Sequence, residues 1–129
     1  MPDFTTMSLE ELISPQGFEC ACGKHHKAGL KHLALGKGAI NRLPDFLLAL
    51  GIRRPFVFGD ENTCRAAGEA VEAQLKAAAL PYTLYVLPQR HPEPDEHTCG
   101  SLLMAFDTAC DGVVAVGSGV MNDAGKVLA

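Results

Sequence analysis

Residues 112–123 read GVVAVGSGVMND, an apolar run that breaks at a Gly-Ser-Gly turn and continues into a helix-like segment. The run from Gly112 to Val116 predicts a fully buried strand. The turn at Gly117, Ser118 and Gly119 suits a phosphate group, because glycines let the backbone approach a ligand closely and the following helix dipole favours an anion. A Gly-x-Gly turn alone is weak evidence, so its meaning depends on the rest of the chain.

The composition is that of one globular domain with an ordinary core. The 129 residues are 47% hydrophobic and 20% charged, with a formal net charge of −4. The chain has no basic run and few aromatic residues, which argues against nucleic acid or a membrane surface as a partner. Five cysteines without a recognisable secretion signal indicate a reducing cytoplasm rather than a disulfide framework.

Strand-like and helix-like segments alternate along the chain. Ser8, followed by Glu11, has the pattern of a capping box and predicts a short helix that ends before Pro15. Further helices are expected at 39–50, with Pro44 in the first turn, at 64–79 after a cap at Asn62 or Thr63, at 96–109, and after Gly119; strands are expected at 32–38, 54–59, 82–87 and 113–116. This order predicts an α/β fold with three α/β/α layers and a mostly parallel sheet.

The N-terminal region carries a group of soft metal ligands. Cys20 and Cys22 stand two residues apart, and His26 follows four residues later. Thiolates and imidazole suit Zn²⁺, but the spacing differs from that of a zinc finger. A strand ending in a turn at Gly23 would place both sulfurs on one face. A plain hairpin is the favoured interpretation, and a weak metal site at these three residues is the alternative.

A second polar loop is expected beside the glycine turn. Asp60, Glu61, Asn62 and Thr63 come directly after the strand at 54–59. Ligands of open α/β sheets bind at the carboxyl ends of the strands, where an acid can accept hydrogen bonds from a ribose. The same acids also complement the dipole of the next helix, which is at least as good an interpretation from spacing alone. In the common dinucleotide fingerprint the glycines come first, whereas here the acid comes first.

These motifs together resemble a known family. The segments 58–63 (FGDENT) and 117–123 (GSGVMND), followed by Lys126, look like the sn-glycerol-1-phosphate dehydrogenases, within the superfamily of iron-containing alcohol dehydrogenases and dehydroquinate synthase. The segments 20–26 (CACGKHH) and 36–40 (GKGAI) resemble bacterial, arabinose-operon-type members. The resemblance implies the Rossmann-like N-terminal domain of the dehydroquinate synthase-like fold.

The resemblance also implies a function and a site. The reaction is the NAD- or NADP-dependent reduction of dihydroxyacetone phosphate to sn-glycerol 1-phosphate, a step of phospholipid metabolism, in a cytoplasmic homo-oligomer. Asp123 is expected nearest the substrate. The residues implied to bind the dinucleotide are Asp60, Asn62, Thr63, Gly117, Ser118, Gly119, Asn122 and Asp123. A carboxylate at Asp60 favours NAD over NADP, because it repels a 2′-phosphate.

The chain also departs from the family pattern. The resemblance implies a Zn, Ni or Fe ion held by one Asp and two His in a C-terminal helical domain, and none of the five histidines here matches those ligands. We expect an N-terminal helical extension over residues 1–17 and a dinucleotide-binding domain over 18–129, in a fragment that does not itself catalyse hydride transfer. The alternatives are a fragment of a dehydroquinate synthase-like or other iron-alcohol-dehydrogenase-type enzyme, and a non-catalytic nucleotide- or zinc-binding module.

Overall fold

The computed structural model describes residues 5–129 and divides the chain into two compact units, Met1–Leu35 and Gly36–Ala129. The sequence-based boundary after residue 17 and the label given to residues 18–129 remain predictions. No helix in the described part of the chain is long and apolar enough to cross a membrane.

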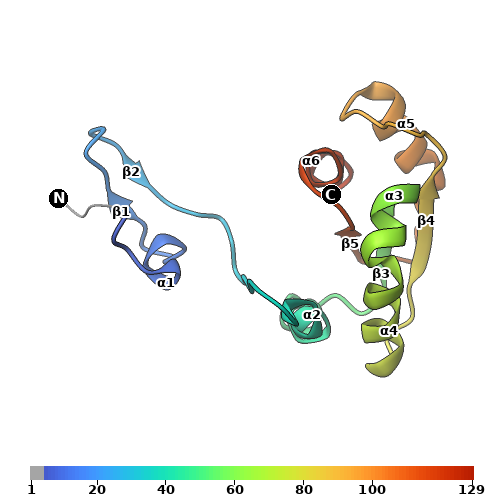
Figure 1. Ribbon diagram of the computed structural model, residues 1–129, viewed down its shortest axis with the longest axis horizontal. Coiled ribbons are helices and arrows are strands. Elements are labelled where there is room, and N and C mark those ends of the chain that lie inside the picture. Colours follow the sequence, from blue (N-terminus) through green and yellow to red (C-terminus); the bar gives the residue numbers. More distant parts are fainter. Residues whose placement is uncertain (1–4) are drawn as a thin grey trace. The chain divides into compact units, whose positions relative to one another are not determined.

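Residues 5–35, the described part of the N-terminal unit, form one short helix and one short hairpin (Figure 1). Helix α1 (Leu9–Leu12) begins with the predicted capping box: the backbone N–H of Glu11 donates to Oγ of Ser8 at 3.2 Å, and the N–H of Ser8 donates to Oε2 of Glu11 at 2.7 Å. Strands β1 (Phe18–Glu19) and β2 (His25–His26) pair in antiparallel fashion. No side chain between residues 5 and 35 is buried, so these described residues form no apolar core.

Two expectations for this unit were wrong. Cys20 and Cys22 do not lie on a strand but in the turn between β1 and β2, which is closed by a hydrogen bond from Cys20 N to Lys24 O at 3.0 Å. The expected strand at 32–38 is absent as well. Gly36 and Gly38 have φ angles of 99° and 83°, a left-handed conformation that belongs to turns and cannot continue a pleated strand.

The second unit is built on a parallel sheet of three strands in the order β4-β3-β5. Strands β3 (Pro55–Asp60), β4 (Thr83–Leu87) and β5 (Gly112–Ala115) match three of the predicted apolar runs. The prediction that the last of these is fully buried was wrong, because β5 is an edge strand whose residues are partly buried or exposed. Phe58 of β3 pairs with Tyr85 of β4 and with Ala115 of β5. The predicted α/β fold with a parallel sheet is confirmed.

Successive side chains of β3 point to opposite faces of the sheet, and helices cover both faces. Phe56 and Phe58 pack on one face with Leu102 of helix α5 (Glu96–Ala105) and Met121 of helix α6 (Gly119–Leu128). Val57 points to the other face and packs in a cluster that includes side chains of three helices. These are η1 (Ala39–Arg42), α2 (Leu43–Ala49), which has the predicted proline in its first turn, and α4 (Glu69–Ala77). Because β3 is central, all three of these β3 side chains are fully buried.

The helix after β3 begins earlier than its sequence predicts. Its cap is Asp60 rather than Asn62 or Thr63, and helix α3 (Glu61–Thr63) follows directly. A π-helical turn, η2 (Cys64–Gly68), joins α3 to α4. Helix α5 is also shorter than predicted, because Phe106 has a ψ of 126° and leaves the helical conformation.

Carboxylates fix the amino-terminal edge of the sheet. Asp111 accepts hydrogen bonds from the backbone N–H groups of Arg54 at 2.8 Å and Arg53 at 2.9 Å, and these bonds lower the pKa of its carboxyl group. Asp107 accepts a 2.6 Å hydrogen bond from the hydroxyl of Thr83, which is the largest cause of its lowered pKa. These acids have structural partners and lie at the edge opposite the predicted ligand site.

Candidate functional site

The two predicted loops meet at the carboxyl edge of the sheet. Strands β3 and β5 are hydrogen-bonded neighbours, and the N–H of Val116 donates to the O of Phe58 at 2.7 Å, just beyond the last paired residues. A Cβ built on Gly59 would lie 2.8 Å from the O of Val116 and 2.7 Å from Oγ1 of Thr63. Glycine at position 59 therefore allows the segment after β5 to pack closely against the start of α3.

Gly117 belongs to the same contact. Its φ is 152°, and a Cβ there would lie 2.5 Å from Cγ of Met121 and 3.1 Å from Cγ2 of Thr63. Position 117 has no room for a side chain, in contrast to Gly119, where a Cβ would meet no atom within 4 Å. The turn therefore packs against the protein at one glycine and faces open space at the other.

The amino terminus of α6 is free of side-chain caps. Helices α3 and α5 also begin at this edge, and the carboxylates of Asp60 and Asp95 accept hydrogen bonds from their first turns. Ser118 occupies the equivalent position before α6, but its side chain makes no capping hydrogen bond. Gly117, Ser118 and Gly119 are all exposed. Backbone N–H groups at such a terminus are available to an anion, and the helix dipole favours its charge.

Asp60 and Thr63 form a reciprocal capping pair. The N–H of Thr63 donates to Oδ1 of Asp60 at 2.8 Å, and the N–H of Asp60 donates to Oγ1 of Thr63 at 3.0 Å. The sequence allowed Asp60 either to cap the helix or to bind a ribose. The structure shows that Asp60 caps the helix. Only Oδ1 accepts this bond, and a carboxylate has a second oxygen for another donor. Asn62 is exposed on the same turn.

Asn122 and Asp123 lie on the exposed side of α6. Asn122 lines a shallow hollow of about 330 Å³ together with Ala115 and Lys126. Oδ1 of Asp123 lies 3.2 Å from Nζ of Lys126, and more than half of each side chain is exposed. Exposed pairs of this kind contribute little to stability, so Asp123 is available to other partners.

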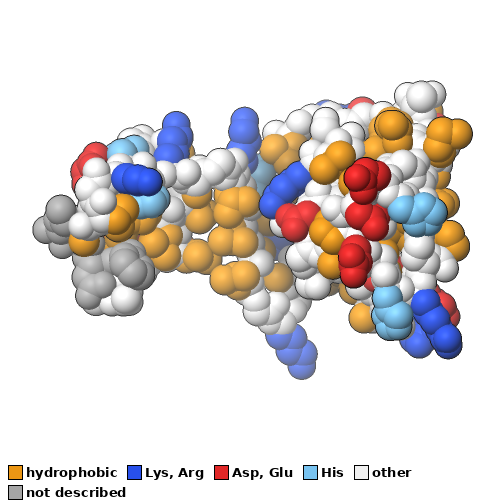
Figure 2. Space-filling model, turned by 90° about the horizontal axis from the view of Figure 1, so that it is seen from above, with side chains coloured by type: hydrophobic (Ala, Val, Ile, Leu, Met, Phe, Trp, Pro, Cys, Tyr) orange, Lys and Arg blue, Asp and Glu red, His pale blue; other side chains and the backbone are white. Residues whose placement is uncertain are grey.

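Carboxylates give this edge a negative character. In Figure 1 strands β3 and β4 run upward, so Figure 2, seen from above, views their carboxyl ends, and acidic side chains gather there. The acids that cap or begin the helices after these two strands are Asp60, Glu61, Asp95 and Glu96. A ligand with many negative charges is disfavoured beside them.

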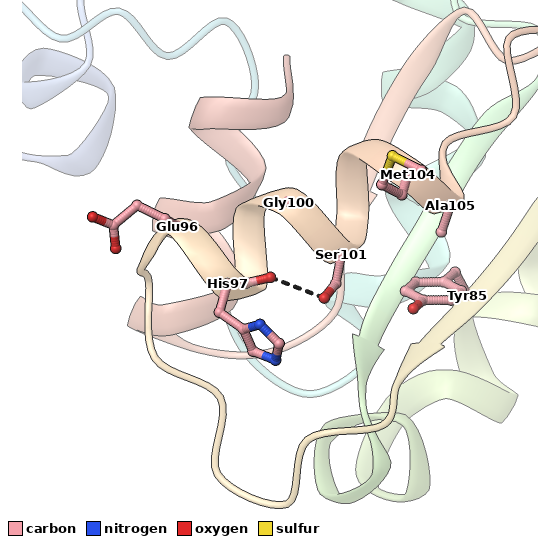
Figure 3. A pocket seen from close by; sticks show the side chains of 7 residues that line it. All are labelled: Tyr85, Glu96, His97, Gly100, Ser101, Met104 and Ala105. Atoms are coloured by element: carbon pink, nitrogen blue, oxygen red, sulfur yellow. Dashed lines mark hydrogen bonds between the residues drawn. The ribbon is translucent and has the colours of Figure 1, made fainter.

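A separate hollow of about 540 Å³ lies between α5 and β4 and was not predicted from the sequence (Figure 3). Tyr85, His97 and Ser101 are among its lining residues. Ser101 combined with His97 would suggest a nucleophile and its base. However, the Ser101 hydroxyl donates to the backbone O of His97 at 2.9 Å, so the imidazole is not its partner (Figure 3). Only the one-turn spacing of these residues on a helix hinted at this grouping.

In the N-terminal unit, Cys20, Cys22 and His26 come together as a group. One ligand atom from each lies within 4.8 Å of the other two, and Sγ of Cys22 is 3.1 Å from Nε2 of His26. Among residues 5–129, no other group of three or more His, Cys, Asp or Glu side chains is close enough to share a metal ion. The described residues therefore do not provide the Asp and His ligands that the family resemblance implies.

Comparison with known proteins identifies the family. A model of the iron-containing alcohol dehydrogenase family matches residues 34–129. The chain therefore belongs to the iron-containing alcohol dehydrogenase family, as the resemblance of its motifs predicted.

The chain is similar to curated relatives that share one name. Glycerol-1-phosphate dehydrogenase (NAD(P)+) of Halalkalibacterium halodurans is 31% identical over 113 residues, which cover 84% of this chain and 28% of that protein. The enzyme of the same name from Bacillus licheniformis is 30% identical over 108 residues, with 81% and 27% covered. The chain thus spans less than a third of the length of these curated relatives.

A solved structure supports the fold. NADH-dependent butanol dehydrogenase A from Thermotoga maritima superposes with a TM-score of 0.57 at 18% sequence identity, covering 73% of this chain and 24% of that chain. At this level of identity the match concerns the fold alone.

Proposed function

We propose that residues 36–129 bind NAD(H) at the carboxyl edge of the sheet, as the cofactor-binding part of a glycerol-1-phosphate dehydrogenase. The observation that carries the proposal is the uncapped, exposed amino terminus of α6 beside a glycine turn that packs against α3. The relatives named glycerol-1-phosphate dehydrogenase favour this reaction, between dihydroxyacetone phosphate and glycerol 1-phosphate, over that of a dehydroquinate synthase-like enzyme.

The residues fit a dinucleotide in three respects. The backbone N–H groups at Gly117–Gly119 would bind the pyrophosphate, with the α6 dipole favouring its charge. The free oxygen of Asp60 would accept a hydrogen bond from the adenosine ribose. Asn122 and Asp123, one turn into α6, would lie toward the nicotinamide and the substrate.

The acidic edge bears on the choice of cofactor. Asp60 and the neighbouring Glu61 would repel the 2′-phosphate of NADP, so we expect NADH to bind more tightly than NADPH. The cofactor supplies a hydride for ketone reduction when it is bound. No step is assigned to a metal ion, because the described residues lack the implied ligands. Self-association as a homo-oligomer remains a prediction.

Paired valine substitutions test the location of the site. Gly119→Val adds bulk where nothing lies within 4 Å, and Gly100→Val adds the same bulk to open space on α5, beside the hollow of Figure 3. Calorimetric titration with NADH should show affinity reduced about tenfold or more, which is about 1.4 kcal/mol, in Gly119→Val. Gly100→Val should bind like the unsubstituted chain. The reverse pattern would move the site to the α5 hollow, and no binding by the unsubstituted chain would refute the proposal.

A further inference from the structure

We propose that Cys20, Cys22 and His26 bind one Zn²⁺ ion, and that this ion orders the N-terminal unit. The proposal does not depend on dinucleotide binding, because all three ligands belong to residues 5–35 and the proposed nucleotide site belongs to residues 36–129.

The register of the hairpin selects which histidine serves as the ligand. His26 pairs with Phe18, and His25 pairs with Glu19. Side chains alternate between faces along a strand, so His26 and Phe18 share one face, and their rings lie 5.7 Å apart. Cys20 follows Phe18 by two residues and continues that face into the turn. His25 is on the opposite face.

His25 already has partners for both ring nitrogens. Its Nδ1 lies 2.7 Å from Oε1 of Glu19, and its Nε2 lies 2.8 Å from the backbone O of Gln16. Neither nitrogen is therefore available to a metal ion in this arrangement. His25 instead ties β2 to β1 and to the segment before it, which leaves His26 as the imidazole on the cysteine face.

The turn brings the two sulfurs to His26. Hydrogen bonds from Cys20 N to Lys24 O at 3.0 Å and from Gly23 N to Cys20 O at 2.9 Å fold residues 20–24 back on themselves. Gly23 has a φ of 79°, which favours glycine over any other residue. Gly17 has a φ of 71°, and a Cβ there would collide with the backbone O of His26. Specific backbone geometry thus holds the three ligands in place.

The ligand set and its spacing suit zinc. Two thiolates and an imidazole are a known zinc combination, and Zn–S and Zn–N bonds of about 2.3 and 2.1 Å place the ligand atoms of a tetrahedral site about 3.6–3.8 Å apart. The three ligand atoms here lie within 4.8 Å of one another, so zinc binding requires side-chain shifts of about 1 Å or less. Two thiolates also balance the charge of the ion. Water would take the fourth position of the tetrahedron.

Residues 5–35 lack the buried apolar core that normally stabilises a folded unit, and a bound metal ion could stabilise them instead. None of residues 5–35 is buried, and the strands of their sheet are two residues long. Domains this small generally need disulfides or a metal ion in place of a core. Zinc binding releases protons from the two thiols and joins the start and the middle of the turn to His26 of β2, so binding and ordering are coupled.

The test uses the full chain purified with a reductant, stripped with a chelator and reloaded with Zn²⁺ or Co²⁺. We expect one equivalent of metal per chain after desalting, and a cobalt spectrum with thiolate charge-transfer bands. Amide hydrogen exchange in residues 5–35 should slow when Zn²⁺ is added, while exchange in residues 36–129 should not change. We expect the Cys22→Ser and His26→Gln variants to retain no metal. Their matched controls outside the cluster, Cys99→Ser and His91→Gln, should each retain one equivalent.

Several outcomes would overturn the proposal. These are an unsubstituted chain that retains no metal, a Cys22→Ser variant that retains it fully, half an equivalent held between two chains, or a disulfide between Cys20 and Cys22 under reducing conditions. Far-UV circular dichroism guards against a variant that has simply failed to fold. Its helical signal comes mainly from residues 36–129 and should be the same in all variants.

Discussion

Replacing Gly117 with alanine should destabilise the fold without any ligand present. The residue has a φ of 152°, which an alanine rarely adopts, and its Cβ would lie 2.5 Å from Cγ and 2.9 Å from Cβ of the buried Met121. Backbone strain of this kind costs about 1–3 kcal/mol, and forcing an extra methyl group into a packed site costs about 1–3 kcal/mol more. We therefore expect Gly117→Ala to lose about 2–6 kcal/mol of unfolding free energy.

The matched control is Gly119→Ala, two residues along the same turn. A Cβ there meets no atom within 4 Å, and the residue begins α6, so the unfolding free energy should stay the same or rise slightly. Urea denaturation followed by far-UV circular dichroism measures both values from the midpoint and the slope. Equal stability of the two variants, within about 0.5 kcal/mol, would contradict the reasoning.

A double substitution separates the steric contact from the backbone strain. Met121→Ala alone should cost about 2–5 kcal/mol, because it empties a buried site. Combined with Gly117→Ala, it also removes the nearest clashing atom, Cγ. The cost of the double variant should therefore fall short of the sum by about 0.5–3 kcal/mol. Strict additivity would show that the side chain of Met121 is not the obstacle.

Three further outcomes are expected. Asp60→Asn should keep the helix cap, with unfolding free energy within about 0.5 kcal/mol of the parent, while NADPH gains affinity relative to NADH; an unchanged ratio in calorimetry would remove Asp60 from the cofactor site. The pKa values of Asp107 and Asp111 are lowered in the folded chain, so their contribution to stability is present above the ordinary carboxyl pKa and is lost as the pH falls through the lowered values. In denaturation experiments, the unfolding free energy of Asp111→Asn should therefore fall less steeply as the pH is lowered. An unchanged pH dependence would argue against the role of Asp111. Burial raises the pKa of Cys64, so iodoacetamide should modify it far more slowly than the exposed Cys22 in metal-free protein, as measured by peptide mass spectrometry; equal rates would contradict this.

The sheet was predictable from the sequence because its strands are continuous apolar runs. Residues 55–60, 83–87 and 112–115 are each bounded by turn or helix-start residues, and parallel strands buried by helices have this appearance. Because helical segments separate these strands, the sequence predicts that they run parallel. Parallel strands in turn predict that the loops at residues 60–63 and 117–119 lie at the same edge of the sheet. The expected strand at 32–38 failed because it has a similar composition but no partner strand and two left-handed glycines.

The parts of the site that escaped prediction depend on contacts between distant residues or on a precise boundary. Asp60, Asn62 and Thr63 are all good cap residues, and only the exact end of β3 decides that Asp60 is the cap. The sequence pattern already grouped His26 with the two cysteines, and the hairpin register supplies the physical reason, because it places His25 on the opposite face. The hollow beside α5 combines residues of α5 with Tyr85 of β4, so the spacing of His97 and Ser101 on the helix reveals only one of its walls.

The π-helical turn at Cys64–Gly68 has a consequence for how this family member can tolerate changes in length. A π-helical turn closes hydrogen bonds between residues i and i+5, so it accommodates one residue more than an α-helical turn. Deleting the exposed Ala66 would let this segment close as an ordinary α-helical turn, which keeps the rotational phase between the Asp60 cap and the buried Val71 and Leu75. The segment should therefore tolerate the loss of one residue, whereas a deletion within α4 should rotate the residues beyond it by about 100°.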